Sequence, residues 1–227
     1  MNIQDIIQST ANDQDLERLK QLPCAEDIFA TLLRVIPFER HEVISVADLG
    51  SADGFLSALV LSQFPEAHIT LIEANEERLN NSRERFIENE HRITCLHNDF
   101  ARSDPPEKYD LIVSAFSIHN LNGIEKRALY RTLYSHVRPN GLFVIADRVK
   151  APTEKLQDNY RHSWAEESLA AGASEADISE TRARMFEDHE SEIEDQLEWI
   201  RNAGFRNVDV YYKNLMFAVY GGHRPDY

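Results

Sequence analysis

"VADLGSADGFLSAL", residues 46–59, is the stretch that decides the fold. An apolar strand pattern runs into Asp48, the chain breaks at Gly50, and apolar residues at helical spacing resume after Gly54. Glycine adopts backbone angles that other residues resist, and the two small residues after Gly50 would let a ligand approach the main chain closely. The stretch predicts a tight turn from a strand into a helix, at the edge where open α/β sheets bind ligands. A plain turn that binds nothing is the alternative.

Strand and helix patterns alternate from about residue 43 to residue 150. Runs typical of strands occupy 41–50, 67–74, 92–100, 109–121 and 140–149. Between them, apolar residues at helical spacing predict helices over 55–64, 75–90 and 123–139. Strands that alternate with crossover helices form a parallel sheet covered on both faces, so we expect a doubly wound α/β domain.

The two ends of the chain carry other patterns. The tail reads as two strands joined by a short turn around Lys213 and Asn214, which makes one edge of the sheet antiparallel. We therefore expect a mostly parallel, seven-stranded, Rossmann-like sheet with a helical cap. The expected parts are an N-terminal helical cap at 1–40, a cofactor-binding core at 41–150, a helical insertion or lid at 151–203 and a C-terminal hairpin at 204–227.

Composition limits the possible partners. The chain has 227 residues, 39 acidic and 24 basic, and its formal charge of −15 argues against a nucleic-acid backbone as the main partner. It has no apolar run long enough to cross a membrane, and its first residues lack the pattern of a secretory signal. Cys24 and Cys95 are too far apart in sequence to indicate a disulfide framework or a zinc site, so we expect a reducing, cytoplasmic location.

An acid follows the glycine turn where a nucleoside ribose would need one. Glu73 ends the second strand pattern, and a carboxylate there can accept hydrogen bonds from both ribose hydroxyls. Taken alone, Glu73 is better explained as a charge that favours the start of the next helix, whereas the glycine turn before it favours the ribose role. The dinucleotide fingerprint G-x-G-x-x-G fails, because Ala52 and Phe55 stand at its second and third glycine positions, and no P-loop lysine follows.

The remaining pattern, acid-x-G-x-A-x-G, resembles the first motif of the class I S-adenosylmethionine-dependent methyltransferases. The resemblance covers about residues 43–150 and extends to the C-terminal hairpin, while "DLGSADG" departs from the family at Ala52. The helical caps and the "AGF" and "FAVYGG" segments are similar to small-molecule methyltransferases. They are also similar to enzymes of the carboxymethoxy wobble uridine pathway, whose cofactor is itself altered.

The resemblance implies a role for each matching residue. Asp48 and the glycine loop would face the methionine part of the cofactor, and Glu73 would bind its ribose. Asp99 would hold the adenine amino group, Phe100 would pack on the adenine ring, and "SAFSIHNL" would line the methyl-transfer site. The residues that the resemblance assigns to the cofactor are Asp48, Gly50, Ser51, Ala52, Gly54, Glu73, Ala74, Asn98, Asp99, Phe100, Ser114, Ala115 and Phe116.

One side chain is a candidate for a direct catalytic role. His119 follows the fourth strand pattern, where an imidazole could accept a proton from a hydroxyl or an amine; the alternative is that it only shapes the pocket. Tyr160 and Trp164 of the helical insertion are candidate substrate contacts, or else core residues. His189 lies between two acids, but three adjacent residues on a helix point in different directions. We therefore expect a solvated helical face there and no metal.

Three functions compete on this basis. The first is methyl transfer from S-adenosylmethionine to an O or N atom of a small metabolite, which releases S-adenosylhomocysteine. The second is modification of a tRNA or a protein, and the net charge counts against RNA. The third is a non-catalytic module that binds S-adenosylmethionine. The sequence determines neither the methyl acceptor nor the oligomeric state.

Overall fold

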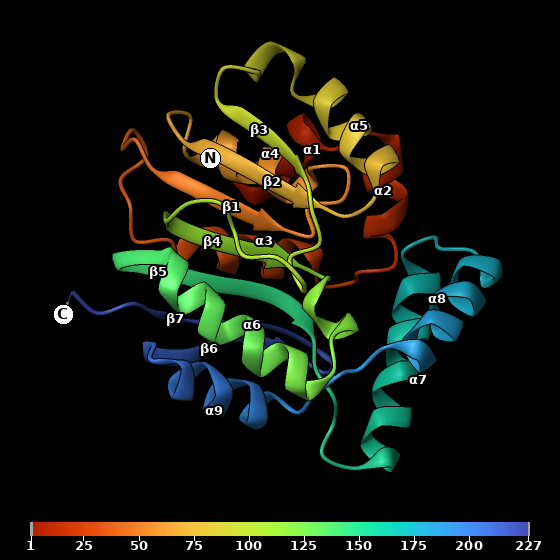
Figure 1. The fold of residues 1–227 in the computed structure, drawn as a ribbon. Helices are drawn as coiled ribbons and strands as arrows, with labels where there is room; N and C mark the ends of the chain where they lie inside the picture. The colour runs from red at the N-terminus through yellow and green to blue at the C-terminus, as the bar shows by residue number, and fades with distance from the viewer. Residues whose placement is uncertain (1, 227) are drawn as a thin grey trace.

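A computed structural model describes residues 2–226 and contains one mixed sheet of seven strands (Figure 1). The strand order is β3-β2-β1-β4-β5-β7-β6, and only β7 runs antiparallel to both of its neighbours. The strands are β1 (Ser45–Leu49), β2 (His68–Glu73), β3 (Ile93–His97), β4 (Tyr109–Ala115), β5 (Val137–Arg148), β6 (Arg206–Asn214) and β7 (Phe217–His223). The predicted fold class is confirmed.

Helices cover both faces of this sheet. The helices are α1 (Ile3–Thr10), α2 (Asp13–Leu19), α3 (Ala25–Arg34), α4 (Phe55–Gln63), α5 (Glu76–Arg85), α6 (Gly123–His136), α7 (Glu154–Ala170), α8 (Glu175–Glu187) and α9 (Ile193–Ala203). Helices α1, α3, α4 and α5 share one apolar cluster with the sheet, whereas α6 and α9 share the other. Strand β4 is buried on both sides, because Leu111 and Val113 face the first cluster and Ile112 faces the second.

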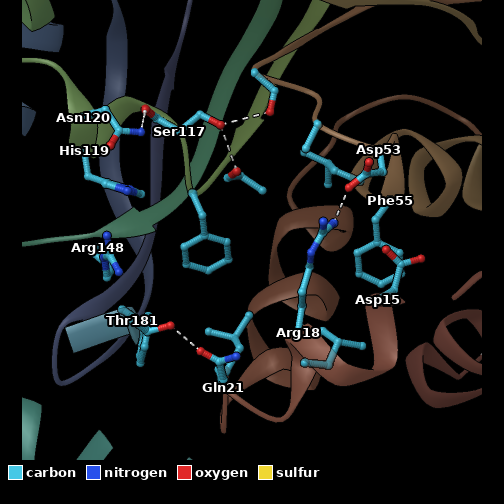
Figure 2. Close-up of a pocket in the computed structure, with 18 of the residues that line it drawn as sticks. Asp15, Arg18, Gln21, Asp53, Phe55, Ser117, His119, Asn120, Arg148 and Thr181 are labelled. Atoms are coloured by element: carbon cyan, nitrogen blue, oxygen red, sulfur yellow. Dashed lines mark hydrogen bonds and ion pairs between the residues drawn. The ribbon is translucent and has the colours of Figure 1, made fainter. Parts of the chain in front are cut away.

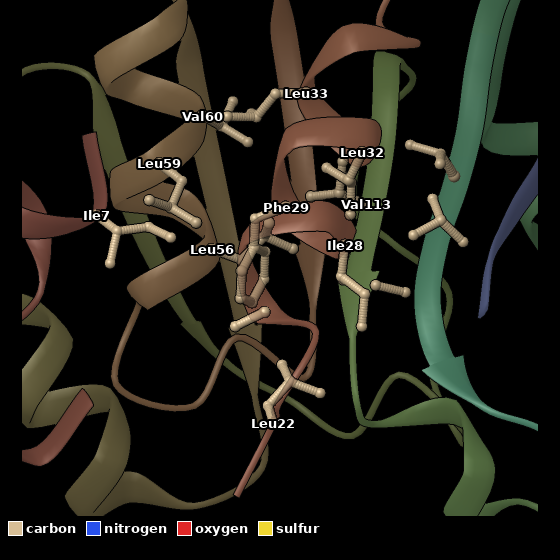
Figure 3. Close-up of a cluster of buried hydrophobic side chains, with 14 of the residues drawn as sticks. Ile7, Leu22, Ile28, Phe29, Leu32, Leu33, Leu56, Leu59, Val60 and Val113 are labelled. Carbon is tan, nitrogen blue, oxygen red and sulfur yellow. The ribbon is translucent and has the colours of Figure 1, made fainter. Parts of the chain in front are cut away.

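The contact between α3 and α4 shows how the apolar pattern holds one layer together (Figure 3). Ile28 and Leu32 of α3 are completely buried, and they belong to the same cluster as Leu59 of α4. The Phe29 and Phe55 rings meet edge to face with centroids 5.4 Å apart. Each such side chain contributes about 1.5–3 kcal/mol on burial, so this layer anchors the N-terminal helices to the sheet.

Helices α7 and α8 leave the sheet and stand beside its carboxyl edge (Figure 1), while α9 packs against α6. No helix within residues 2–226 is long and apolar enough to cross a membrane. The C-terminal hairpin is present, but the turn predicted at Lys213 and Asn214 is wrong by two residues. Both residues belong to β6 and pair with β7, and the reversal falls at Leu215 and Met216, where Leu215 adopts a φ of +50°.

Candidate active site

A cavity of about 470 Å³ opens at the carboxyl edge of the sheet. Its walls come from the loops after β1 and β4, the end of β5, the N-terminal segment that includes α2, and the pair α7 and α8 (Figure 2). We call the part next to residues 48–53 the glycine end. We call the part next to His119, Arg148 and Asp188 the histidine end.

The glycine end is built from backbone that an ordinary side chain would obstruct. Gly50 has a φ of +68°, and a Cβ there would lie 2.4 Å from the Oγ of Ser117. Gly54 has a φ of +81° and caps α4. Ala52 also adopts a left-handed φ of +48°, which is strained for a residue with a Cβ. Glu73 holds this strained residue in place, because its Oε2 accepts a hydrogen bond of 2.9 Å from the Ala52 N–H.

Asp48 supplies a buried carboxylate at the glycine end. Its side chain is 1% exposed, Oδ2 accepts a 2.7 Å hydrogen bond from Ser57, and Oδ1 has no partner. Burial raises the pKa of Asp48 to about 7. A buried carboxylate oxygen without a donor suits a ligand cation such as an ammonium group, which would both pair with the charge and lower that pKa.

Helix α2 closes over the glycine loop through an ion pair that the sequence did not reveal. Arg18 of α2 donates to Asp53, whose other carboxylate oxygen accepts a 2.9 Å hydrogen bond from Asn81 of α5. Burial alone would raise the pKa of Asp53, but the hydrogen bonds from Asn81 and Arg18 hold it below its usual range. Arg18 belongs to a generic amphipathic helix, and no sequence signal marks its contact with a loop 35 residues away.

His119 lies at the opposite end of the cavity (Figure 2), where it is buried and a carboxylate orients it. Its Nδ1 lies 2.6 Å from Asp147 Oδ1, and its backbone N–H donates to Asp147 Oδ2 over 2.8 Å. Burial would raise the pKa of Asp147, yet the neighbouring His119 and Arg148 hold it below the usual value. Sequence reasoning missed Asp147, although its place at the end of an apolar strand is the signal that singled out Asp48 and Glu73.

A second carboxylate approaches the free nitrogen of His119. Asp188 Oδ1 lies 3.7 Å from His119 Nε2, while Asp188 Oδ2 pairs with Arg148. The expectation of a solvated helical face around His189 is wrong, because α8 ends at Glu187. The His189 side chain is exposed, but its neighbours turn inward and are 7% exposed.

The segment after α8 is fastened to the core by backbone bonds. The N–H of His189 donates to the carbonyl of His119 over 3.0 Å, and the buried Lys126 Nζ donates to the carbonyl of His189 over 2.5 Å. Glu190 lies 3.3 Å from the Arg148 guanidinium. Strand β5, η2 (Ile118–Asn120) and the segment after α8 therefore form one connected polar cluster.

Aromatic side chains cover the cavity between its two ends. Trp164 of α7 lines it, is 2% exposed and donates from Nε1 to the carbonyl of Gln21 over 2.8 Å. Phe116 and Phe217 meet edge to face with centroids 6.2 Å apart, and both line the cavity. Tyr160 does not line it and instead lies under the Lys213 ammonium, 5.3 Å from the ring centroid.

The residues assigned to an adenosine lie farther along the same edge of the sheet. Glu73 is 8% exposed and accepts hydrogen bonds from the N–H groups of Ala52 and Asn75. Asp99 Oδ1 accepts from the N–H of Ala101. Neither acid lines the cavity, so the ribose and adenine roles stay predictions.

The structure thus divides the predicted site residues into two groups. Those that line the cavity are Asp48, Gly50, Ser51, Ala52, Ala115, Phe116, His119 and Trp164. Those that do not are Gly54, Glu73, Ala74, Asn98, Asp99, Phe100, Ser114 and Tyr160. Among residues 2–226, no group of three or more His, Cys, Asp or Glu side chains is placed to hold a metal ion.

Comparison with known proteins shows similarity to methyltransferases and to a related synthase. Residues 47–143 match a family model described as a methyltransferase domain. The malonyl-(acyl-carrier protein) O-methyltransferase of Acetivibrio thermocellus is 31% identical over 84 residues, which cover 37% of this chain and 29% of that protein. The carboxy-S-adenosyl-L-methionine synthase of Hydrogenovibrio crunogenus is 22% identical over 180 residues, which cover 76% of this chain and 70% of that protein.

A solved structure shares the fold. An O-methyltransferase family protein from Burkholderia thailandensis superposes with a TM-score of 0.66 at 15% identity, over 93% of this chain and 58% of that chain. This chain therefore spans 29% and 70% of the two curated relatives and somewhat more than half of the structural neighbour.

Proposed function

We propose that this chain is a class I S-adenosylmethionine-dependent methyltransferase that transfers a methyl group to an O or N atom of a small molecule, because residues 47–143 match a methyltransferase domain. The observation that carries this proposal is one cavity that joins the glycine turn and Asp48 to the buried pair of His119 and Asp147. A cofactor site and a proton acceptor are the two parts that such a transfer needs.

The glycine end fits the amino-acid part of S-adenosylmethionine. The unpartnered Oδ1 of Asp48 suits its ammonium group, and the bare backbone at Gly50 leaves room for a close approach. When bound, the cofactor supplies a methyl group that is already activated by its sulfonium. The task left to the protein is to align an acceptor atom and exclude water.

The histidine end can receive the proton that a hydroxyl or amine loses when it is methylated. Asp147 orients the imidazole of His119 through Nδ1, so that Nε2 is presented as the proton acceptor. Trp164, Phe116 and Phe217 line the cavity with apolar surface that keeps water away from the reacting atoms.

The size and cover of the cavity favour a small methyl acceptor. A volume of about 470 Å³ lies within the range of roughly 300–1,000 Å³ typical of small-molecule sites. Residues of α7 and α8 form part of its wall and narrow access to it, which disfavours a folded RNA or protein as the substrate.

Two measurements test the proposal. Calorimetric titration should detect micromolar binding of S-adenosylmethionine and S-adenosylhomocysteine but no binding of NAD, which lacks an amino-acid part. The protein should then methylate members of a library of small amines and alcohols, detected by mass spectrometry. Absence of binding by both sulfur nucleosides would refute the proposal, whereas binding without any turnover would support a non-catalytic module instead.

A further inference from the structure

Two hydrogen-bond acceptors face the histidine end of the cavity with no donor directed at them. They are Nε2 of His119 and Oδ1 of Asp188, which lie 3.7 Å apart on side chains that are each 7% exposed. Both residues line the cavity, and no residue among 2–226 donates a hydrogen bond to either atom. Both atoms are accessible from the cavity, and two acceptors this close need a donor between them, so this pair suits a ligand group that carries N–H or O–H hydrogens.

The surrounding contacts orient both atoms, which are acceptors when His119 is neutral. Asp147 is a carboxylate that accepts hydrogen bonds from the backbone N–H groups of His119 and Arg148, and from Nδ1 of His119. Nδ1 is therefore the protonated nitrogen of a neutral His119, and the neutral form that a proton acceptor requires presents a lone pair at Nε2. The other oxygen of Asp188 pairs with the Arg148 guanidinium, which offsets the carboxylate charge and fixes the direction of Oδ1.

We propose that the methyl acceptor is an amine, whose two N–H groups bind Nε2 of His119 and Oδ1 of Asp188. This inference rests on the proposed function and selects between its two acceptor atoms. For acceptors 3.7 Å apart, a nitrogen about 2.9 Å from both would bend each hydrogen bond by only about 15°, which remains good geometry. The third substituent is the carbon skeleton, so the nitrogen lone pair stays free for the methyl group.

A hydroxyl group fits the same two atoms less well. An alcohol has one O–H hydrogen, so it can satisfy Nε2 of His119 or Oδ1 of Asp188, but not both. The second acceptor would then face the lone pairs of the hydroxyl oxygen in a buried site. A buried acceptor left without a donor costs roughly 1–3 kcal/mol, equivalent to about a 5- to 150-fold loss of affinity.

Each bond, electron pair and proton in the proposed methyl transfer can be accounted for. The lone pair of the neutral amine forms the N–C bond to the methyl carbon, while the S–C bond of the sulfonium breaks and its electron pair stays on sulfur. One N–H proton then passes to Nε2 of His119, and Asp147 stabilises the resulting imidazolium. The products are the methylated amine, S-adenosylhomocysteine and a proton that His119 releases to solvent.

Matched pairs of amines and alcohols test the proposal by binding alone. The protein, saturated with S-adenosylhomocysteine, is titrated calorimetrically with benzylamine against benzyl alcohol and with tryptamine against tryptophol. We expect at least one amine to bind about tenfold more tightly than its alcohol partner. A panel in which no amine binds more tightly than its partner overturns the inference. If S-adenosylhomocysteine itself does not bind, the failure belongs to the proposed function.

The substitution Asp188→Asn sharpens the test. The amide oxygen of the new side chain should remain with Arg148, which turns its NH₂ group toward the position of Oδ1. The site then offers one donor, the new amide, and one acceptor, Nε2 of His119, which together match a hydroxyl group. The binding preference should therefore move from the amine to the alcohol. Glu190→Gln is the matched control, because Glu190 also contacts Arg148 but does not line the cavity. It should keep the amine preference, and a shift of equal size in this control overturns the inference.

A spectroscopic measurement needs neither a substrate nor a variant in Asp188. Nitrogen-15 NMR of histidine-labelled protein, with His119 assigned by its absence in His119→Gln, reports which ring nitrogen carries hydrogen. We expect the proton on Nδ1 and a free lone pair on Nε2 in the complex with S-adenosylhomocysteine. A proton found on Nε2 contradicts the proposal, because the site would then present a donor to the incoming group.

Discussion

The two ends of the cavity are assembled in different ways. The glycine end comes from one continuous stretch, residues 48–53, in which residue types dictate the backbone path. The histidine end gathers His119 after β4, Asp147 at the end of β5 and Asp188 after α8. A local turn can be recognised from its own residues, whereas a cluster from three segments exists only once the strand order has brought them together.

Removal of the imidazole should have the largest effect and should separate the two ends. His119→Ala removes the proton acceptor, so we expect turnover to fall about 10²- to 10⁴-fold while S-adenosylmethionine affinity stays within about twofold. Steady-state kinetics and calorimetry measure the two quantities. The control is His189→Ala, whose side chain is exposed and contributes only backbone bonds to the cluster. An equal loss of affinity and turnover would mean that His119 shapes the whole cavity.

A side chain placed in the glycine turn should have the next largest effect. In Gly50→Ala, the new Cβ would clash with Ser117 and the positive φ would be strained, so we expect a loss of about 2–4 kcal/mol in unfolding free energy. Denaturant unfolding measures it. In Gly172→Ala the φ of +94° is also unfavourable, but nothing lies within 4 Å, so the loss should be clearly smaller. Equal losses in both variants would show that strain alone, without close approach, governs the turn.

Asp48→Asn should weaken binding but strengthen the fold at alkaline pH. Loss of the charged partner should reduce S-adenosylmethionine affinity about 10- to 100-fold. Because the folded-state pKa of Asp48 is raised to about 7, the wild type binds an extra proton when folded and loses stability as pH rises from about 4 through 7. The variant should lack that decline.

Unfolding free energies at pH 5 and pH 8 measure this difference. The exposed Asp104→Asn is the control for a simple change of net charge. A wild type whose stability does not fall relative to Asp48→Asn over this interval would show that Asp48 is ionised without cost in the folded protein.

The ion pair that joins α2 to the glycine loop should have the smallest effect. Arg18→Ala should cost about 1 kcal/mol, because Arg18 is 44% exposed and water screens the pair. The pKa of Asp53 is held low in the folded state, so this stabilisation should be present at neutral pH and lost as pH falls below the usual carboxyl range. Urea unfolding at pH 7 and pH 3 measures it, with Lys20→Ala of the exposed Lys20–Glu17 pair as control. An unchanged cost at pH 3 would assign the effect to packing.

Features set by residues close together in the sequence were predicted correctly, whereas features set by contacts between distant segments were not. The strand pattern around Asp48 and the run that includes Leu111, Ile112 and Val113 depend on nearest neighbours, and the structure confirms them as buried strands. His189 was predicted on a helix because acids and apolar residues continue the helical pattern. The helix instead ends at Glu187, where the following residues gain bonds to the core that no local pattern contains.

By itself, the sequence determined the alternation of strands and helices, the left-handed turn at Gly50 and the presence of an acid at the end of each early strand. These follow from side-chain period and backbone sterics, which act over a few residues. Only the tertiary structure decided that Asp147 would orient His119, that Asp188 would lie 3.7 Å from its free nitrogen, and that Arg18 would reach Asp53. Those contacts join distant segments, and their geometry is set by how the helices pack on the sheet rather than by any residue's own preference.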